Sequence, residues 1–189
     1  MQAEIRVIRS GRRTLSLEIT KEAQVLVRAP YRLSRSEIEK FVQEKADWLE
    51  KHLKEVKNKL EDRKEHPVRP LYMEEIRRLA DEAMRVLPEK AAYYAPKVGV
   101  SYGRITIRNQ RTRWGSCSGK GNLNFNCLLM LAPEQVQDYV VVHELCHRLE
   151  MNHSARFWSE VERVFPDYRI AKQWLKEHGE EIMRRMTGN

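Results

Sequence analysis

Long apolar runs are missing from this sequence. No stretch of the 189-residue chain approaches the ~20 consecutive apolar residues that a membrane-spanning helix requires. Residues 1–6 likewise carry no apolar segment of the signal-peptide kind. The sequence therefore predicts a cytoplasmic protein without a membrane partner.

Cysteine is also scarce. The chain has three cysteines, Cys117, Cys127 and Cys146, with no close pair among them. An odd number at such spacing argues against a disulfide framework and against a four-cysteine zinc site. We expect three buried thiols in a reducing compartment.

Acidic residues are absent from the middle of the chain. The formal net charge is +8, and no aspartate or glutamate lies between Glu89 and Glu134. The basic residues of that stretch are Lys90, Lys97, Arg104, Arg108, Arg111, Arg113 and Lys120. Concentrated positive charge suits a nucleotide, a nucleic acid or an acidic substrate, and the charge alone does not choose among them.

The N-terminal part of the chain predicts strands. Polar and apolar residues alternate over 4–9 and 14–19, and a third apolar segment at 25–30 ends on a proline. Short links between these segments predict a small antiparallel β-meander.

A helix is expected after these strands. Ser34 and Glu37 have the spacing of a capping box, and apolar residues recur at helical spacing over 38–53. The charged stretch at 51–69 indicates a solvated helix end and a linker, closed by two prolines. The expected domains are 1–65, the meander and helix, and 66–189.

The second half of the chain mixes helical and strand patterns, which predicts an α+β fold. Helices are expected over 72–87, from Pro133 into the motif described next, after Ser154 and near the C-terminus. The strand-like segments are 98–102, 105–108 and 122–127.

A metal-binding pattern lies on one of these helices. Residues 143–147 read His-Glu-Leu-Cys-His, and residues four apart share one helix face. His143 and His147 can therefore bind one metal ion, while Glu144 takes a proton from a metal-bound water and returns it to the leaving group. Nitrogen ligands with an open fourth position indicate zinc. The alternative is a pair of core histidines, which a buried helix would have to satisfy by hydrogen bonds.

A catalytic zinc site needs a third protein ligand, and His153 is the candidate. It lies six residues beyond His147, the interval of the HExxHxxGxxH pattern, in which glycine lets the chain turn back. Glu150 occupies the glycine position, so the turn must differ, and Asn152 could make it by adopting left-handed backbone angles. The competing ligands on the following helix are Glu160 and Glu162.

Several segments together resemble a known family. They are Asn-Gln-Arg-Thr-Arg-Trp-Gly-Ser-Cys at 109–117, the HELCH motif, Asn-His-Ser at 152–154, Phe157-Trp158, Val-Arg-Ala-Pro at 27–30 and the helix with Trp48. The chain resembles the YgjP-like metallopeptidases over nearly its whole length, and more distantly the SprT-like and WLM metalloproteases. The resemblance implies a zincin-like domain, with a small antiparallel sheet packed on the active-site helix and further helices. It also implies Zn²⁺ held by His143, His147 and His153, with Glu144 as the acid/base.

The segment at 109–117 supplies candidates for substrate binding. An extended peptide could pair with a strand between Ile105 and Cys127, as in zincin folds. Arg111 or Arg113 could then stabilise an oxyanion or hold an acidic group of the substrate. The alternatives are a solvated strand face for the arginines and core packing for Trp114.

Three functions compete at this stage. The first is a zinc metallopeptidase that cleaves a peptide or protein substrate. The second is a metal-dependent phosphohydrolase acting on nucleotides, because the basic stretch suits phosphate, although a single three-histidine site is unusual for that chemistry. The third is a protease associated with nucleic acid, although the chain carries no recognisable nucleic-acid-binding motif.

Overall fold

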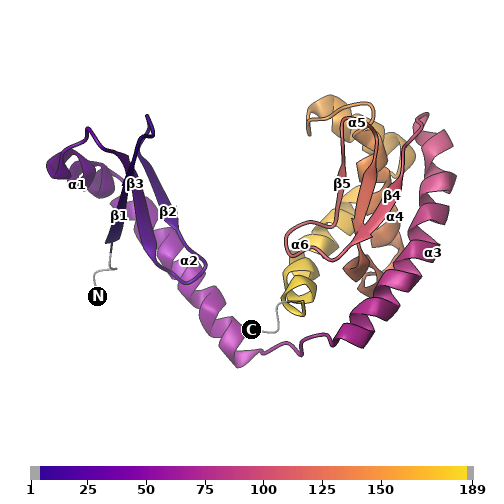
Figure 1. Cartoon of the computed structure of the whole chain (residues 1–189), viewed down its shortest axis with the longest axis horizontal. Helices are drawn as coiled ribbons and strands as arrows, with labels where there is room; N and C mark the ends of the chain where they lie inside the picture. Colours follow the sequence, from indigo (N-terminus) through magenta and orange to yellow (C-terminus); the bar gives the residue numbers. More distant parts are fainter. Residues whose placement is uncertain (1–4, 187–189) are drawn as a thin grey trace. The chain divides into compact units, whose positions relative to one another are not determined.

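A computed structural model describes residues 5–186 and shows an α+β fold, as the sequence predicts. The chain divides between Pro67 and Val68 into two compact units, called here the N-terminal unit and the C-terminal unit. Figure 1 shows the strands and first two helices of the N-terminal unit in indigo and purple, and the C-terminal unit from magenta to yellow. Within the described residues, no helix is both long and apolar enough to cross a membrane.

The N-terminal unit contains a three-stranded sheet. Its strands are β1 (Ile5–Ser10), β2 (Ser16–Ile19) and β3 (Val25–Pro30), in the order β1-β3-β2. β3 pairs in parallel with β1 and antiparallel with β2, so the strand segments are as expected but their order is not that of an antiparallel meander. The burial of Val25, Val27 and Ala29 explains the difference, because the most apolar strand takes the central position. β1 lies at the edge, where Ile5 and Val7 remain 42% and 44% exposed.

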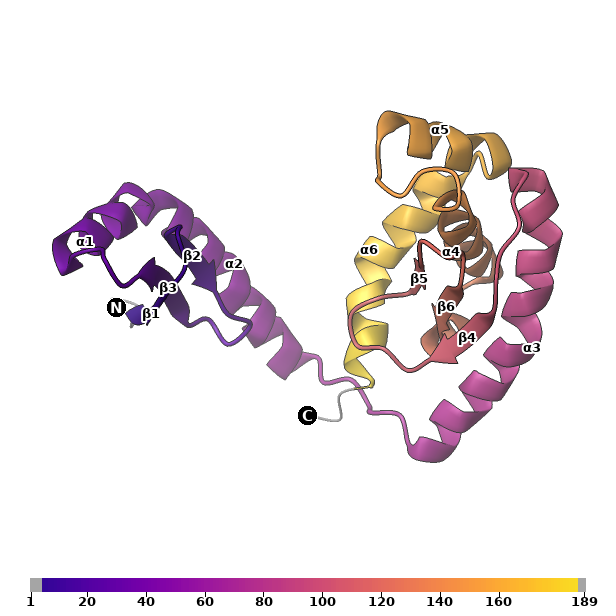
Figure 2. The ribbon, with the colours of Figure 1, turned by 45° about the horizontal axis from the view of Figure 1, so that its top comes forward.

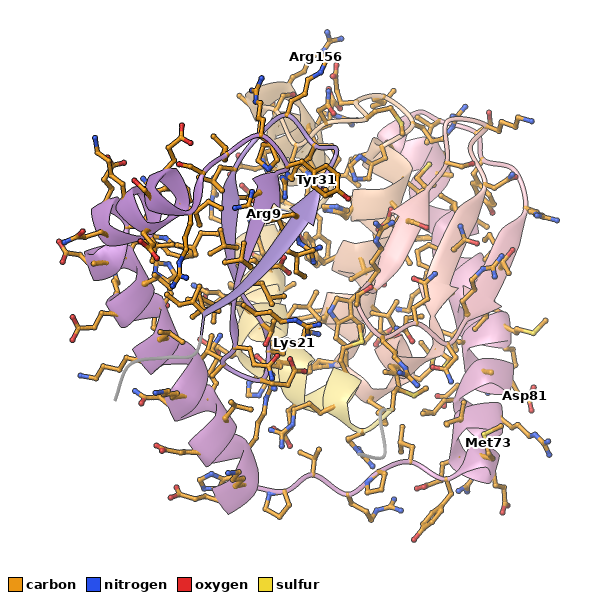
Figure 3. The ribbon with its side chains drawn as sticks, turned by 60° about the vertical axis from the view of Figure 1, so that its left-hand side comes forward. Arg9, Lys21, Tyr31, Met73, Asp81 and Arg156 are labelled. Atoms are coloured by element: carbon orange, nitrogen blue, oxygen red, sulfur yellow. The ribbon has the colours of Figure 1, made fainter. Side chains whose placement is uncertain are left out.

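The loop that follows β3 is tied back to β1. The Arg9 guanidinium donates to the backbone carbonyls of Tyr31 and Leu33 at 3.2 and 2.5 Å. Figure 3 shows Arg9 and Tyr31 side by side. This fixes the point at which the chain leaves the sheet and begins its first helix.

Two helices complete the N-terminal unit, α1 (Arg35–Glu44) and α2 (Ala46–Glu65). Ser34 and Glu37 form the expected capping box at the start of α1, and Ile38 packs against β3 in the core of this unit. α2 continues through the charged stretch that was expected to fray into a linker, because lysine, glutamate and leucine are strong helix formers. It ends just before Pro67, where the following proline disfavours helical angles.

The C-terminal unit contains a second three-stranded sheet. Its strands are β4 (Ile105–Arg108), β5 (Gly115–Cys117) and β6 (Leu123–Asn126), in the order β4-β6-β5. β6 is antiparallel to β5 but parallel to β4, so this sheet is mixed rather than antiparallel as expected. A tight turn ending at Gly121, with φ of +80°, folds β6 back along β5. The buried Leu123 and Phe125 make β6 the central strand.

A long helix, α3 (Met73–Val98), supports this sheet. It extends beyond the shorter helix expected at 72–87 and contains Pro88 and Pro96. The strand expected at 98–102 is not formed, because the helix includes Val98 and residues 99–102 adopt no strand conformation. Ala83, Leu87, Ala91 and Ala95 are buried at four-residue spacing, so packing outweighs the cost of the prolines. Figure 3 shows Met73 and Asp81 on the opposite, outward side of this helix. The helix ends at Gly99 in left-handed conformation, as helix C-termini often do.

The remaining elements build the functional site. They are a 3₁₀ helix (Cys127–Leu131), α4 (Glu134–Cys146), α5 (Ala155–Val164) and α6 (Tyr168–Arg184). α4 packs against α3 and α6, and β5 lies over it, as Figure 2 shows. All three cysteines are free, as expected, and Cys127 and Cys146 are buried. Cys117 is only partly buried, contrary to the expectation of three buried thiols.

Candidate metal centre

The candidate site begins at the C-terminal end of α4. This helix is buried over most of its length, including Val140, Val141 and Val142, because it runs between α3 and α6. His143 lies in its last turn, and His147 caps it with helical backbone angles. The His147 N–H donates to the His143 carbonyl at 3.3 Å, so the two imidazoles keep the helical spacing that the sequence predicts.

After the helix, the chain turns back without a left-handed residue. The backbone N–H groups of Leu149 and Glu150 both donate to the Cys146 carbonyl at 3.0 Å, which tightens the last turn. Within residues 5–186, Ala23 is the non-glycine residue with positive φ. Asn152 therefore does not turn in the left-handed conformation that was considered for it. Its carbonyl instead accepts from the Ser154 N–H at 2.8 Å.

This return brings His153 to the other two histidines. One ring nitrogen from each of His143, His147 and His153 lies within 4.8 Å of the others. The Nε2 atoms of His143 and His153 are 3.0 Å apart. Two nitrogen lone pairs that close require a proton or a cation between them, so the three rings converge as metal ligands do.

The competing ligands are engaged elsewhere. Glu160 accepts from the Arg163 guanidinium at 2.8 and 3.0 Å, and Glu162 accepts from Arg169 at 2.6 Å. Neither belongs to the group of convergent donor atoms found in the described residues. The geometry therefore favours three histidines over two histidines and a glutamate.

A backbone carbonyl orients one of the rings. His147 Nδ1 lies 3.0 Å from the Glu150 carbonyl oxygen, which can only accept, so Nδ1 carries the proton. This leaves the Nε2 lone pair free for a metal, as outer-shell hydrogen bonds to ligand histidines commonly do. In the described chain, His143 Nδ1 is buried without a hydrogen-bond partner.

Burial keeps His143 and His147 neutral. It lowers the pKa of His143 from 6.5 to about 3, with smaller contributions from His147, His153 and Lys172. Burial also lowers the pKa of His147, against the effect of its bond to Glu150. Metal binding requires the neutral imidazole, so both rings are in the binding form at neutral pH.

Glu144 lies beside the histidine group and is buried from solvent. It is 5% exposed, and burial raises its pKa from 4.5 to about 8, while the positive charge of Arg113 acts in the opposite direction. β5 crosses directly over this side chain. A Cβ added to Gly115 would lie 2.7 Å from Glu144 Cγ and Oε1, so only glycine admits the carboxylate there.

Two aromatic side chains of α5 pack against the histidines. Phe157 stacks on His147 with ring centroids 4.6 Å apart, and Trp158 stacks on His153 at 5.7 Å. Ser154 caps this helix as predicted, accepting from the Phe157 N–H at 3.3 Å. The sequence indicated both aromatics as a helix face but gave them no role at the site. The signal available was their position four and five residues after His153, in the first turn of the expected helix.

A buried asparagine organises the loop before β5. Asn126 is fully buried, and its Nδ2 donates to the carbonyls of Gln110 and Arg113 at 2.7 and 2.9 Å. Its Oδ1 accepts from the Leu128 N–H at 3.1 Å. The sequence gave no signal for this role, because the bonds span 13 and 16 residues.

The three residues predicted to bind substrate lie in different environments. Arg113 is exposed, and its charge acts on Glu144. Arg111 is also exposed. Trp114 packs on the core, where a Cβ added to Gly179 of α6 would lie 3.2 Å from its ring.

The basic stretch between Glu89 and Glu134 is not one continuous cationic surface. Lys90 is only 13% exposed and bonds Glu134 and Asp138 at 3.0 and 2.7 Å, so its charge is neutralised inside the unit. Lys97 lies over the Tyr93 ring, 3.6 Å from its centroid.

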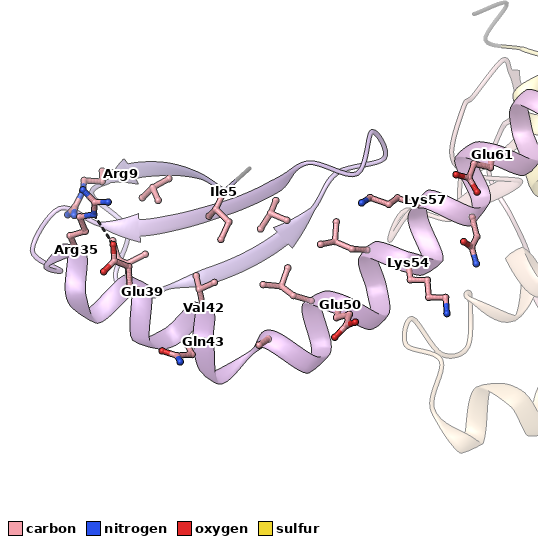
Figure 4. A pocket seen from close by; sticks show the side chains of 17 residues that line it. Ile5, Arg9, Arg35, Glu39, Val42, Gln43, Glu50, Lys54, Lys57 and Glu61 are labelled. Atoms are coloured by element: carbon pink, nitrogen blue, oxygen red, sulfur yellow. Dashed lines mark hydrogen bonds and ion pairs between the residues drawn. The ribbon is translucent and has the colours of Figure 1, made fainter. Parts of the chain in front are cut away.

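A hollow lies in the N-terminal unit. It has a volume of about 1390 Å³ and lies between β1 and the two helices, as Figure 4 shows. Its lining includes the apolar side chains of Ile5, Val42 and Leu49 and the charged side chains of Glu50 and Lys54. Within the described part of the chain, the group able to hold a metal ion is that of His143, His147 and His153, none of which lines this hollow.

A buried helix with the HExxH pattern and a third convergent histidine defines the class of metallohydrolases. The chain matches the family described as YgjP-like, metallopeptidase domain, over residues 13–79 and 73–178. It belongs to this YgjP-like family and is a metallopeptidase, as its resemblance to the family implied. Membership in the family implies a catalytic metal.

Two solved structures are similar to part of the chain. One is the metallopeptidase zymogen abylysin of Pyrococcus abyssi, with 25% identity and a TM-score of 0.46 over 54% of this chain and 100% of that one. The other is the zymogen jannalysin of Methanocaldococcus jannaschii, with 17% identity and a TM-score of 0.43 over 48% and 94%. A comparison with curated proteins found no match.

Proposed function

We propose that the protein is a zinc-dependent metallopeptidase in which His143, His147 and His153 hold the ion and Glu144 carries the protons of peptide-bond hydrolysis. The observation that carries this proposal is the convergence of three imidazole nitrogens within 4.8 Å, next to a buried carboxylate. The Glu144 carboxyl group makes no hydrogen bond within residues 5–186, so its burial costs free energy. A purely structural cluster of histidines would not explain why that cost is retained.

The donor set supports zinc as the ion. Three neutral imidazoles from one helix and its return loop leave a fourth position for water or substrate, as in catalytic zinc sites. Magnesium, calcium and manganese prefer oxygen ligands, and none of the three donors is a carboxylate. The orientation of His147 by the Glu150 carbonyl matches the outer-shell arrangement of such sites.

The mechanism assigns each protein group a separate task. A bound zinc ion supplies Lewis acidity, polarising the scissile carbonyl and acidifying water. Glu144 accepts the proton of the attacking water and delivers it to the leaving amine. Its burial raises the pKa to about 8 without a metal, which suits a group that must both accept and donate. A bound cation would lower this pKa, because it favours the carboxylate.

The loop before β5 is the proposed substrate-binding element. We propose that Arg113 presents a positive charge to the substrate beside Glu144 and that Arg111 extends this positive surface. Trp114, packed on α6 at Gly179, holds the loop in place. The Asn126 side chain holds the same loop by donating hydrogen bonds to two of its backbone carbonyls.

The central test separates chemistry from metal binding. Glu144→Gln should retain zinc and lose activity on unfolded protein substrates by about 10²–10⁴-fold, the range for a general acid/base. Zinc content is measured by mass spectrometry on the same samples. Full peptidase activity in Glu144→Gln would overturn the assignment of Glu144.

A second test addresses the ligands. His153→Ala should weaken zinc binding by about a hundredfold or more, because a direct ligand counts for at least as much as an outer-shell partner. His178→Ala is the matched control, since His178 is an exposed histidine of α6. Full zinc occupancy in His153→Ala would mean that the third ligand is another residue.

A second candidate function is hydrolysis of nucleotides. Exposed Arg108, Arg111, Arg113 and Lys120, in a stretch without acidic residues, favour a phosphate-bearing substrate. Incubation of the zinc-loaded protein with nucleoside triphosphates would release phosphate if this were the activity. Affinity for DNA that falls steeply with added salt would instead support a protease associated with nucleic acid.

A further inference from the structure

One cation beside the histidine group has no assigned function. Lys172 is exposed on α6, and its Nζ lies 4.0 Å from the centroid of the Trp158 ring. Trp158 in turn packs on His153 and His143, at 5.7 and 5.9 Å between ring centroids. The aromatic face therefore holds the ammonium group next to the proposed zinc ligands.

A second cation approaches from a different element. Arg113 lies two residues before Gly115, the residue over which the Glu144 carboxylate packs. The Arg113 carbonyl is fixed by Asn126, while its guanidinium is exposed. Within residues 5–186, neither Arg113 nor Lys172 forms an ion pair.

The acidic residues around the site are, in contrast, already paired. Arg156 bonds Glu150 at 3.0 Å, and Arg163 and Arg169 bond Glu160 and Glu162. No acidic residue occurs between Glu89 and Glu134. The charges left over near the histidine group are therefore positive, apart from Glu144 itself.

We infer that Lys172 and Arg113 select substrates with an acidic side chain beside the scissile bond, so that the enzyme prefers acidic peptides. This inference rests on the proposed peptidase function and names its substrate class. The arginine guanidinium and the lysine ammonium group both bind carboxylates. A partly exposed ion pair with a substrate carboxylate raises the affinity by up to about fivefold. Phosphate shares this chemistry, but the family is a metallopeptidase family, so the anion belongs to a peptide.

Binding is measured first, in a form that does not depend on cleavage. The zinc-loaded Glu144→Gln protein is titrated into fluorescent peptides that are identical except for Glu or Gln on either side of the central bond. Fluorescence anisotropy should show about fivefold tighter binding of the Glu peptide at low salt, with a smaller difference at high salt.

Variants then assign the preference to the two cations. Lys172→Gln and Arg113→Gln, each in the Glu144→Gln background, should reduce the preference, and together they should abolish it. Lys172→Arg should keep it, which separates charge from packing on Trp158. Lys176→Gln is the matched control, because Lys176 is exposed on α6 one turn further on and should leave the preference unchanged.

Cleavage by the protein with Glu144 intact distinguishes the two proposals. A higher kcat/KM on the Glu peptide, lost in the double variant, supports both. Cleavage of both peptides at equal rates, with equal binding, overturns the inference and leaves the peptidase function standing. Tighter binding of the Glu peptide without cleavage of any peptide overturns the function and supports the two cations as an anion site. Binding of inorganic pyrophosphate in preference to both peptides overturns acidic peptides as the substrate class.

Discussion

At the scale of the residue, the close packing of Gly115 on Glu144 constrains both positions. β5 can lie directly on the carboxylate because position 115 has no side chain, and a Cβ there would be 2.7 Å from two Glu144 atoms. The strand thereby shields the acid/base from bulk solvent and restricts the position of its side chain.

Gly115→Ala should displace the Glu144 side chain while leaving the three histidines in place. Because a displacement of about 1 Å at a catalytic group can cost a hundredfold, we expect kcat to fall by about a hundredfold with zinc content unchanged. Gly119→Ala is the control, since a Cβ there meets nothing within 4 Å. Equal loss in both variants would show that backbone strain, and not the contact with Glu144, is responsible.

The titration of buried groups makes a prediction for the metal-free protein. The folded pKa of His143, about 3, lies below its ordinary 6.5, so acid protonates the unfolded chain first and stability falls as the pH drops below 6.5. The folded pKa of Glu144, about 8, lies above its ordinary 4.5, so stability falls as the pH rises from 4.5 to 8. In the presence of a chelator, the C-terminal unit should be most stable between pH 4.5 and 6.5.

Thermal unfolding at a series of pH values with chelator checks this expectation. Glu144→Gln removes the carboxyl group and should flatten the decline of Tm between pH 6.5 and 8, where the Glu144 contribution is not offset by that of His143. A Tm that declines equally in the variant and the wild type over this range would assign the decline to other groups.

At the scale of the element, the start of α5 connects a helix cap to the metal site. Ser154 caps the helix, the preceding residue is His153, and Phe157 packs on all three histidines. Fraying of this helix end would therefore disturb the third proposed ligand directly.

Ser154→Ala should lower the free energy of unfolding by about 1 kcal/mol, the usual cost of losing such a cap. It should also weaken zinc binding, because His153 loses its fixed position. Ser34→Ala at the cap of α1 is the matched control, with a similar cost in the N-terminal unit and no effect on zinc. Both quantities come from denaturant unfolding and zinc titration of the same preparations. Unchanged zinc affinity in Ser154→Ala would contradict the connection.

The elements also show what the sequence could and could not predict. The helix starts at Ser34 and Ser154 could be predicted from the capping residues, Glu37 included, because capping is a local interaction. The order of the strands was not predictable in this way, because β3 and β6 become central through contacts with distant parts of the chain. α3 was underestimated because Pro88 and Pro96 argue locally for a break, which packing of its buried alanines overrides. The role of Asn126 could not be predicted either, because its hydrogen-bond partners are remote in sequence.

At the scale of the whole molecule, the two units have separate cores. Val27, Ala29 and Ile38 form the core of the N-terminal unit, and a larger cluster fills the C-terminal unit. His143, His147 and His153 all belong to the C-terminal unit. We propose that residues 1–65 and 66–189 are independent domains, the first formed by strands and helices and the second by the catalytic fold.

Removal of the metal should then affect one unfolding transition. A ligand present at a thousand times its Kd stabilises the unit that binds it by about 4 kcal/mol. Calorimetry with and without chelator should show one transition that moves and one that does not. Ile38→Ala should shift the other transition, because it removes a buried side chain of the N-terminal core. A single transition that moves as a whole in both experiments would mean that the domains unfold together.

The bond from His147 to the Glu150 carbonyl has a consequence for recognising such sites in other sequences. Every amino acid possesses a backbone carbonyl, so the orientation of this ligand places no demand on the identity of residue 150. The Glu150 side chain is free to bond Arg156 at 3.0 Å while its main chain serves the site. A search pattern that insists on glycine at this point would overlook proteins built in this way. A pattern that specifies the three histidines and leaves the intervening position open would find them.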